Sequence, residues 1–386
     1  MFVFYEFFSG GGMARAGLGK EWNCQFANDF DSKKASSYIA NWGDEHFTEC
    51  DIRDLSAKNL PSKPSLLWAS FPCQDLSLAG SGLGLMGERS STVQHIWRLI
   101  RELKIDDRAP DVITFENVCG LLTSRGGRDF AKIVQDFDKH GYDVGAVVID
   151  AVLFVPQSRK RIFFIAVKKG KILPIATLSK VPVDGYAPKN LIRAVEKLPK
   201  SYRTKWLWWN LPKVNSTSVT LDEIIQSGKG LEWHSGESTA RLLSQMNQAH
   251  FDKVEKASKL RRVTYATIYR RTRVENGQRV VRAEARFDGI AGCLRTPNGG
   301  SSKQILLEVN GYQVRSRHLS GRECARLMGL PDSYQIPRNH NQALYLAGDG
   351  VAVPVVKFLS KSILLPVVKA IESPQIRRTT RVLTAA

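Results

Sequence analysis

The chain has 386 residues, of which 43% are hydrophobic and 24% are charged, and its formal net charge is +19. This composition is typical of a globular protein with one large core and a smaller second unit, and it excludes collagen-like and wholly disordered chains. The charge is uneven: residues 1–165 carry 19 basic and 21 acidic side chains, whereas residues 166–386 carry 37 and 16. A near-neutral part followed by a basic part predicts a catalytic or small-ligand unit joined to a unit that binds a polyanion.

Other classes of protein are excluded by simple patterns. No run approaches the roughly 18 apolar residues of a membrane span, and the first segment, MFVFYEFF, lacks the basic start of a secretory signal. The six cysteines lie far apart with no Cys-x-x-Cys pair, which disfavours a zinc site or a disulfide framework. We therefore expect a cytoplasmic protein without a metal or a membrane partner, in which a functional cysteine acts singly.

Short apolar runs alternate with helical patterns through residues 1–167. Strands are predicted at Phe2–Phe8, Cys24–Asp29, Ser65–Ser70, Asp111–Glu116, Val144–Val152 and Arg161–Val167. Helices are predicted at Ala14–Leu18, Lys33–Asn41, Ser91–Leu103 and Asp129–His140. This alternation predicts an α/β fold with a parallel, doubly wound sheet, whose ligands bind at the carboxyl ends of the strands.

The pattern changes after about Lys168. Prolines interrupt the chain, and residues 256–286 contain ten Lys or Arg against two acidic residues. We interpret 168–335 as a smaller, irregular basic domain. The tryptophans at 206, 208 and 209 are assigned to its core, with a base-stacking platform as the alternative. Residues 336–372 contain a predicted helix, Ala352–Leu365, whose apolar face is expected to return to the first sheet, and residues 373–386 form a basic tail.

A glycine-rich turn, residues 9–13, follows the first predicted strand and precedes a helix. Gly10 and Gly12 would let the backbone approach a ligand at the helix N-terminus. Asp29 ends the second strand, where a carboxylate can bind ribose hydroxyls. The spacing lacks the full Gly-x-Gly-x-x-Gly pattern, which favours an adenosine ligand other than a dinucleotide. A bare structural turn and a solvated loop acid are the alternatives.

Three further strand ends carry candidate chemistry. Cys73 follows the third strand and opens a polar, glycine-rich loop, a suitable position for a nucleophile, although a lone cysteine is often an inert core residue. Glu116 follows the fourth strand at the same sheet edge and could protonate or hydrogen-bond a substrate ring nitrogen, or it could simply lie beside a helix cap. Gln157, Arg159 and Arg161 alternate on an extended segment and so share one face, as a binding surface or as a solvated edge.

In this order, the segments closely resemble the DNA (cytosine-5) methyltransferases of the bacterial and phage type. The matching motifs of the first part are Phe8-x-Gly10-x-Gly12, Asn28-Asp29, Asp51-Ile52, Pro72-Cys73-Gln74, Glu88-Arg89-Ser90, Glu116-Asn117-Val118 and Pro156-Gln157-x-Arg159-x-Arg161. The later motifs are Arg317-x-Leu319-Ser320-x-Arg322-Glu323, Gly329-x-Pro331 and Gly348-Asp349-Gly350-Val351. Met13 and Asp349 depart from the usual glycine and asparagine.

The resemblance implies a Rossmann-like class I methyltransferase sheet with S-adenosylmethionine as cofactor. Cys73 would attack C6 of a flipped-out cytosine, Glu116 would contact N3 and the exocyclic amine, and Arg161 would hold the carbonyl, with Arg159 and Gln157 organising the site. The residues implied for cofactor binding are Phe8, Gly10, Gly12, Asp29, Phe30, Asp51, Ile52, Pro72, Asp349 and Val351. Residues 168–335 would recognise the target.

Duplex DNA is the implied substrate, bound by a monomer that could have a cognate restriction endonuclease as a partner. The residues predicted to contact DNA are Gln74, Ser77, Arg89, Gln157, Arg261, Arg262, Arg270, Arg271, Arg295, Gly299 and Gly300. Two alternatives stay open: a tRNA cytosine-5 methyltransferase on the same scaffold, and a non-catalytic DNA-binding regulator. Gln74 and the long insert favour DNA, and the intact set of Cys73, Glu116 and Arg161 favours an enzyme.

Overall fold

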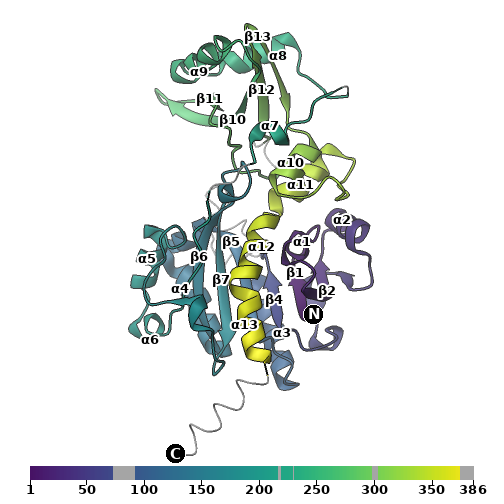
Figure 1. The fold of residues 1–386 in the computed structure, drawn as a ribbon, viewed down its shortest axis with the longest axis vertical. Helices are drawn as coiled ribbons and strands as arrows, with labels where there is room; N and C mark the ends of the chain where they lie inside the picture. The colour runs from purple at the N-terminus through teal and green to yellow at the C-terminus, as the bar shows by residue number, and fades with distance from the viewer. Residues whose placement is uncertain (73–91, 216–218, 229, 298–302, 374–386) are drawn as a thin grey trace, which may run out of the picture. The chain divides into compact units, whose positions relative to one another are not determined.

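The computed structural model describes residues 1–72, 92–215, 219–228, 230–297 and 303–373 (Figure 1). The chain divides into two compact units. Unit 1 comprises Met1–Ile149, Lys160–Val214 and the chain from Val355, and unit 2 comprises Asp150–Arg159 and Asn215–Pro354. These units differ from the predicted division at Lys168, because residues 168–214 pack within unit 1. The assignment of 168–335 to target recognition stays a prediction.

Unit 1 is built on a seven-stranded sheet of order β3-β2-β1-β4-β5-β7-β6. Its strands are β1 (Phe2–Phe7), β2 (Trp22–Asp29), β3 (Phe47–Glu49), β4 (Leu66–Ala69), β5 (Val112–Val118), β6 (Tyr142–Asp150) and β7 (Lys160–Lys168). The pairs from β3 through β5 are parallel, as expected. β7 instead pairs with β5 in antiparallel fashion, which corrects the prediction of a parallel sheet. Only residues 151–159 separate β6 from β7, too few for the helical crossover that a parallel return requires.

Helices cover this sheet. They are α1 (Met13–Leu18), α2 (Ser32–Trp42), α3 (Val93–Ile105), α4 (Arg128–His140), α5 (Lys189–Glu196), α6 (Lys200–Arg203) and α13 (Leu365–Glu372). The Asp31 side chain caps α2 by accepting from the backbone of Lys33 and Lys34. Near the end of the chain, Ser360 accepts from the Trp22 indole at 2.9 Å, and Ser65 donates to Glu372 at 2.6 Å. These bonds hold the α13 region against unit 1.

The tryptophans at 206, 208 and 209 belong to the core of unit 1, so their predicted place in a basic second domain is wrong. Trp206 packs on Phe130 with ring centroids 5.7 Å apart, and the Trp209 indole donates to the Ile165 carbonyl on β7 at 3.2 Å. Gly145 on β6 makes this packing possible, because a Cβ there would lie 1.9 Å from the Leu207 carbonyl oxygen. The local sequence does not show this contact, which forms across about sixty residues.

Unit 2 contains an antiparallel sheet of order β11-β10-β12-β13, with strands β10 (Thr264–Glu275), β11 (Gln278–Arg286), β12 (Ile305–Asn310) and β13 (Gln313–His318). Its helices are α7 (Leu221–Ile224), α8 (Gly236–Ser244), α9 (Gln248–Ser258), α10 (Gly321–Leu327) and α11 (His340–Asp349), followed by α12 (Val353–Leu359) at the border between the units. Ala266, Ile268 and Leu307 form a core with Leu242 of α8 and Val254 of α9. This region is therefore more regular than predicted.

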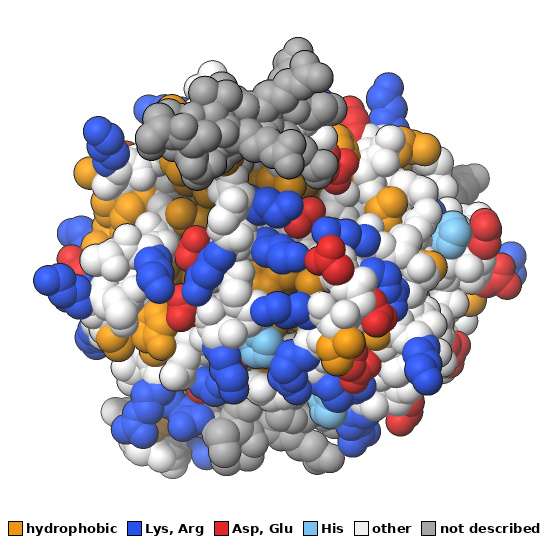
Figure 2. All heavy atoms as spheres, turned by 90° about the horizontal axis from the view of Figure 1, so that it is seen from below, with side chains coloured by type: hydrophobic (Ala, Val, Ile, Leu, Met, Phe, Trp, Pro, Cys, Tyr) orange, Lys and Arg blue, Asp and Glu red, His pale blue; other side chains and the backbone are white. Residues whose placement is uncertain are grey.

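Basic side chains of unit 1 commonly have acidic partners. Lys169 and Lys205 both pair with Asp138, and Lys171 pairs with Asp111 at 3.2 Å. On the face drawn in Figure 2, Lys and Arg side chains lie among Asp and Glu side chains. In these pairs, lysines from the basic later part of the sequence are partly neutralised by aspartates from the near-neutral first part.

In the part of the chain that the structure describes, one helical stretch, His340–Glu372, is long and apolar enough to cross a membrane, and its most apolar window has a mean hydropathy of 1.8. However, 61% of its most apolar window is buried inside the protein, as in a core helix of a globular protein.

Candidate active site

Glu116 and Arg161 form an ion pair at one edge of the unit 1 sheet, with Glu116 Oε1 3.2 Å from Arg161 Nε. The register of the antiparallel strands explains the pair: Val118 lies opposite Arg161 and Glu116 opposite Phe163, so the two charged side chains are diagonal neighbours on one face. Their side chains are only 8% and 14% exposed. The structure thus brings these two predicted residues together, and their catalytic roles stay a prediction. A fixed, nearly dry carboxyl group is suited to hydrogen-bonding a substrate ring.

Asn117 links this pair to the end of the neighbouring strand. Its amide donates to the Phe71 carbonyl at 3.2 Å, and Phe71 packs on Phe115 with ring centroids 5.6 Å apart. β4 and β5 are parallel, with Ala69 opposite Phe115, so the chain leaves both strands at the same edge. Asn117 therefore fixes the backbone that leads directly into Pro72 and Cys73. The predicted residues Cys73, Gln74, Ser77 and Arg89 lie outside the described residues, as do Gly299 and Gly300.

The glycine-rich turn has a backbone that depends on its glycines. Gly12 has φ +81°, and a Cβ there would lie 2.4 Å from the Trp42 indole nitrogen. Gly10 has φ +56° and open space where a side chain would be. Phe8 has φ 55°, an uncommon conformation for a bulky residue and one that is concentrated at functional sites. The turn thus presents a narrow backbone surface with room for a ligand at Gly10.

Asp29 at the end of β2 is joined directly to this turn. One carboxylate oxygen accepts from the Gly10 amide at 2.8 Å, and the other accepts from the Asp31 amide at 3.0 Å. Burial raises the pKa of Asp29 above its usual range, while Lys34 and the two amides act in the opposite direction. Each oxygen keeps a second acceptor position, so the carboxylate can still receive a ribose hydroxyl.

The remaining predicted cofactor residues of unit 1 lie at neighbouring strand ends. The Phe30 ring is 64% exposed directly after β2, whereas Ile52 is buried. The Asp51 carboxylate accepts from the Arg53 amide at 2.8 Å, and the hydrogen bonds from Arg53 hold its pKa below the usual range. The Asn28 amide donates to the backbone carbonyls of Thr48 and Cys50, which ties β2 to this segment. An exposed aromatic ring beside carboxylates can accommodate an adenosine.

Glu6 was not predicted by the sequence analysis. It lies on β1, its side chain is buried, and its carboxylate accepts from the backbone amides of Ala14 and Arg15 at the start of α1. Burial raises its pKa to about 8, although the Arg15 charge lowers it. The signal in the sequence was a single acid within the apolar run FVFYEFF, which is unusual for a buried strand. Glu6 therefore contacts the start of α1, the helix that follows the glycine-rich turn.

Gln157 was predicted to contact DNA, but the structure gives it a positioning role. Its side chain is fully buried, and its amide donates to the Leu327 carbonyl at 2.8 Å and accepts from the Leu294 amide at 3.0 Å. Both ends of the amide are thus bound to the backbone of unit 2. As placed, Gln157 cannot reach a nucleic acid.

Arg159 was grouped with the catalytic residues, and its contacts likewise make it a positioning residue. It is 2% exposed, and its guanidinium donates to the carbonyls of Leu294, Gly348 and Gly350 at 2.6–2.9 Å. It lies in unit 2, whereas Glu116 and Arg161 lie in unit 1. The residue fixes two segments of unit 2, the one that leads into residues 295–297 and the one around Asp349.

The predicted cofactor residues Asp349 and Val351 also lie in unit 2. Asp349 is exposed and Val351 is buried. A Cβ on Gly348 would lie 2.5 Å from the Thr296 amide nitrogen, so only glycine permits this close approach. The Gly348 segment is therefore packed directly on the chain around Thr296.

The predicted DNA-binding arginines of unit 2 lie on or beside β10. Arg261, Arg262, Arg271 and Arg295 are exposed, and Arg270 is half-buried. Arg271 pairs with Glu284 at 3.2 Å, so its charge is partly neutralised. The arginines thus remain accessible to a polyanion.

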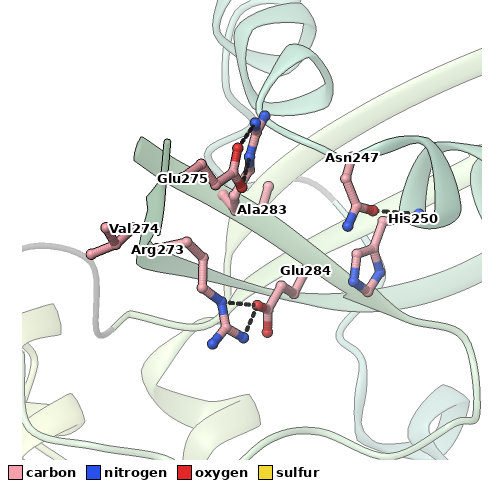
Figure 3. Close-up of a pocket in the computed structure, with 8 residues that line it drawn as sticks. Asn247, His250, Arg273, Val274, Glu275, Ala283 and Glu284 are labelled. Atoms are coloured by element: carbon pink, nitrogen blue, oxygen red, sulfur yellow. Dashed lines mark hydrogen bonds and ion pairs between the residues drawn. The ribbon is translucent and has the colours of Figure 1, made fainter. Parts of the chain in front are cut away.

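A pocket of about 500 Å³ lies at the β10–β11 hairpin. Figure 3 shows Arg273 bonded to Glu284 there, with Asn247 and His250 of the α9 region opposite. Arg282 and Glu275, which also line the pocket, form a second ion pair, so their charges are mutually neutralised. The pocket contains none of the predicted site residues. Within the described parts of the chain, no group of three or more His, Cys, Asp or Glu side chains could hold a metal ion.

The sheet, the glycine-rich turn and the acid at the end of β2 define a Rossmann-like methyltransferase fold. Comparison with solved structures agrees with this class. The chain is similar to the Dnmt2 methyltransferase of S. pombe, with a TM-score of 0.60, 16% identity and coverage of 95% of this chain and 99% of that one. The Entamoeba histolytica methyltransferase EhMeth gives a TM-score of 0.61 at 15% identity, covering 94% and 97%.

The family is shown by the sequence comparisons. The family model for C-5 cytosine-specific DNA methylases matches residues 2–365, so the chain belongs to this family. Among curated relatives, the Type II methyltransferase M.HaeII of Haemophilus aegyptius is 26% identical over 363 residues, covering 93% of this chain and 92% of the relative. The Type II methyltransferase M.HhaI of Haemophilus parahaemolyticus is also 26% identical, over 366 residues and 93% of each chain. The protein is a DNA cytosine-5 methyltransferase.

Proposed function

We propose that this enzyme methylates C5 of a flipped-out cytosine in duplex DNA, with S-adenosylmethionine as the methyl donor and Cys73 as the nucleophile. The observation that carries the proposal is the Glu116–Arg161 pair, held beside the strand end that leads into Pro72 and Cys73. The cofactor assignment is supported by the open backbone at Gly10, the Asp29 carboxylate behind it and the exposed Phe30 ring. S-adenosylmethionine supplies an electrophilic methyl group.

The residues of the chain supply the rest of the chemistry. C5 of cytosine is a poor nucleophile until a thiolate adds to C6, so the Cys73 sulfur forms a bond to C6 and the ring gains electron density at C5. Glu116, when protonated, donates to N3, and its other oxygen accepts from the exocyclic amine, which eases this addition. After C5 is methylated, water or hydroxide takes the C5 proton, the electrons of that C–H bond re-form the C5–C6 double bond, and the sulfur leaves C6 as the thiolate. Arg161 keeps the Glu116 carboxylate oriented throughout.

A base must leave the helical stack before a side chain can reach its C6 atom. The basic residues of unit 2 would hold the duplex by its phosphates during this step, with an affinity that falls steeply as salt increases. We further propose that the enzyme acts in the cytoplasm as a monomer. A cognate restriction endonuclease remains an expectation.

A labelling experiment tests this proposal. Purified protein is incubated with methyl-labelled S-adenosylmethionine and duplex DNA, and the label is followed into 5-methylcytosine. Transfer by the wild type, lost in Cys73→Ala, supports the proposal. If the wild type and Cys73→Ala label DNA equally, Cys73 is not the nucleophile; if tRNA is labelled in preference to duplex DNA, the substrate assignment is wrong.

A further inference from the structure

A group of cationic side chains gathers at one end of the unit 2 sheet. His318 is the last residue of β13, and its ring lies 5.0 Å from that of His234, almost perpendicular to it. Ile268 pairs with Ile305, and Ile305 pairs with His318, so these three residues share one face of the sheet. Arg270 lies two residues beyond Ile268 on β10 and therefore faces the same side. His234, Arg270 and His318, with Lys303 and His340, are called the histidine cluster below.

Polar atoms of this cluster are buried without a protein partner. Among the described residues, neither His318 Nδ1 nor Arg270 Nε has a hydrogen-bond partner. His234 uses Nδ1 for the Ser316 hydroxyl at 2.9 Å, so Nε2 is the nitrogen that it can offer to a ligand. Buried groups in native proteins are rarely left unsatisfied, and such exceptions often mark the place of a missing ligand or water.

The charges around His318 are of one sign. Burial contributes most to its low pKa of about 4, and Lys303 and Arg270, together with His234 and His340 when these are protonated, lower it further. Burial and Arg270 also lower the pKa of His234. Burial and Lys303 lower the pKa of His340, whereas Glu232 raises it. Because the permanently charged members of the cluster, Lys303 and Arg270, are both cations, the cluster is a poor place for a metal cation and a favourable one for an anion.

We propose that the histidine cluster binds a backbone phosphate of the DNA duplex, and that His318 takes up one proton from solvent as the phosphate binds. This inference rests on the proposed function, since it assumes that duplex DNA is the substrate. The position in the sequence supports a nucleic-acid phosphate: Lys303 lies two residues before β12 and follows the stretch from Arg295 to Gly300 that was predicted to contact DNA. A phosphate would supply the negative charge and the hydrogen-bond acceptors that Arg270 and His318 lack.

The first test measures the affinity of the full-length protein for a fluorescein-labelled duplex between about pH 7.5 and about pH 5.5. Uptake of one proton on binding tightens the wild-type affinity as the pH falls, by at most about tenfold per pH unit. His318→Gln keeps a polar side chain but cannot titrate, so it should weaken binding and flatten this pH dependence. His46→Gln in unit 1 is the matched control and should keep the wild-type profile. Arg270→Gln should lose the phosphate contact, so the slope of the logarithm of the affinity against the logarithm of the salt concentration should become shallower by about one.

The second test uses the wild type alone, so it does not depend on a variant that folds. The His318 ring proton is titrated by NMR in chloride, in inorganic phosphate at equal ionic strength, and with the duplex. A higher pKa of His318 with the duplex, together with a flattened profile in His318→Gln, supports the proposal. A pKa that rises only with inorganic phosphate overturns it, because the cluster would then bind a free anion. An unchanged pKa in all three also overturns it. If the wild type binds no duplex at all, the proposed function itself fails.

Discussion

The Glu116–Arg161 pair gives the most specific prediction about the site. In Arg161→Ala the Glu116 carboxylate, 8% exposed, would lose the guanidinium at 3.2 Å. Removing one partner of a buried pair typically destabilises a protein by 3–5 kcal/mol. Since both side chains keep some contact with solvent, we expect a loss of about 2–3 kcal/mol in the free energy of unfolding of unit 1. Because Gln is neutral, Glu116→Gln should remove much of this penalty when it is combined with Arg161→Ala.

Urea unfolding followed by tryptophan fluorescence measures this effect in the relevant unit, because seven of the eight tryptophans lie in unit 1 and only Trp233 lies in unit 2. The double-mutant cycle should show a coupling of about 1–3 kcal/mol. Lys205→Ala is the control: its pair with Asp138 is exposed, and its loss should cost less than about 1 kcal/mol. If Arg161→Ala costs no more than Lys205→Ala and the cycle is additive, the pair does not hold Glu116, and the reasoning about the site fails.

Three further predictions concern the cofactor turn and the nucleophile. Gly12→Ala should abolish S-adenosylmethionine binding in calorimetry, because the new Cβ would lie 2.4 Å from the Trp42 indole nitrogen. Gly43→Ala is the control and should bind normally, since Gly43 has a similar φ of +74° but open space around it. Equal binding by both variants would contradict the role of the turn. Asn117→Ala should lower the methylation kcat about 10–100-fold and leave the DNA affinity unchanged. Without the hydrogen bond to the Phe71 carbonyl, the activation free energy should rise by about 1.4–2.8 kcal/mol, because the backbone before Cys73 is no longer held in place. A reduction seen only in DNA affinity would refute this. The pKa of Glu6 is raised to about 8 from a usual 4.5, so the folded state binds this proton more tightly than the unfolded state does. The Tm of the wild type should therefore fall as the pH rises from about 4.5 to about 8, and Glu6→Gln should remove this part of the decline. Parallel Tm profiles of the two proteins would show that Glu6 does not titrate in this range.

Much of the first sheet could be predicted because its signals are local. Apolar runs such as Phe2–Phe7, followed by a glycine turn and an amphipathic helix, already determine the strand, the turn and the edge where ligands bind. The direction of β7 was missed because it depends on the length of the connection rather than on the strand itself. The regular sheet of unit 2 was missed for a different reason: the outer half of β10 is exposed and rich in arginine, which hides the apolar alternation of Ala266 and Ile268.

The candidate site shows the same division. Glu116 and Arg161 could be predicted because each lies on a strand next to the sheet edge. The roles of Gln157 and Arg159 could not be predicted from the local sequence. Their polar side chains look suited to DNA, but they are buried and hydrogen-bond to the backbone at Leu294 and Gly348, which lie far away in the sequence. Glu6 was missed because nothing in the strand shows that its carboxylate meets the start of α1.

The central claim is that Cys73 adds to C6 of a cytosine in duplex DNA, and a covalent trap tests it most directly. When the target base is 5-fluorocytosine, C5 carries fluorine in place of the proton that must leave after methyl transfer. The elimination is then blocked, so the enzyme should remain covalently bonded to the DNA. With S-adenosylmethionine, the wild type should give a protein–DNA band that survives denaturing electrophoresis, and peptide mapping should place the bond at Cys73. Cys73→Ser should give no such band. A wild-type enzyme that methylates ordinary duplex DNA but never forms this adduct, or forms it at another residue, would contradict the account.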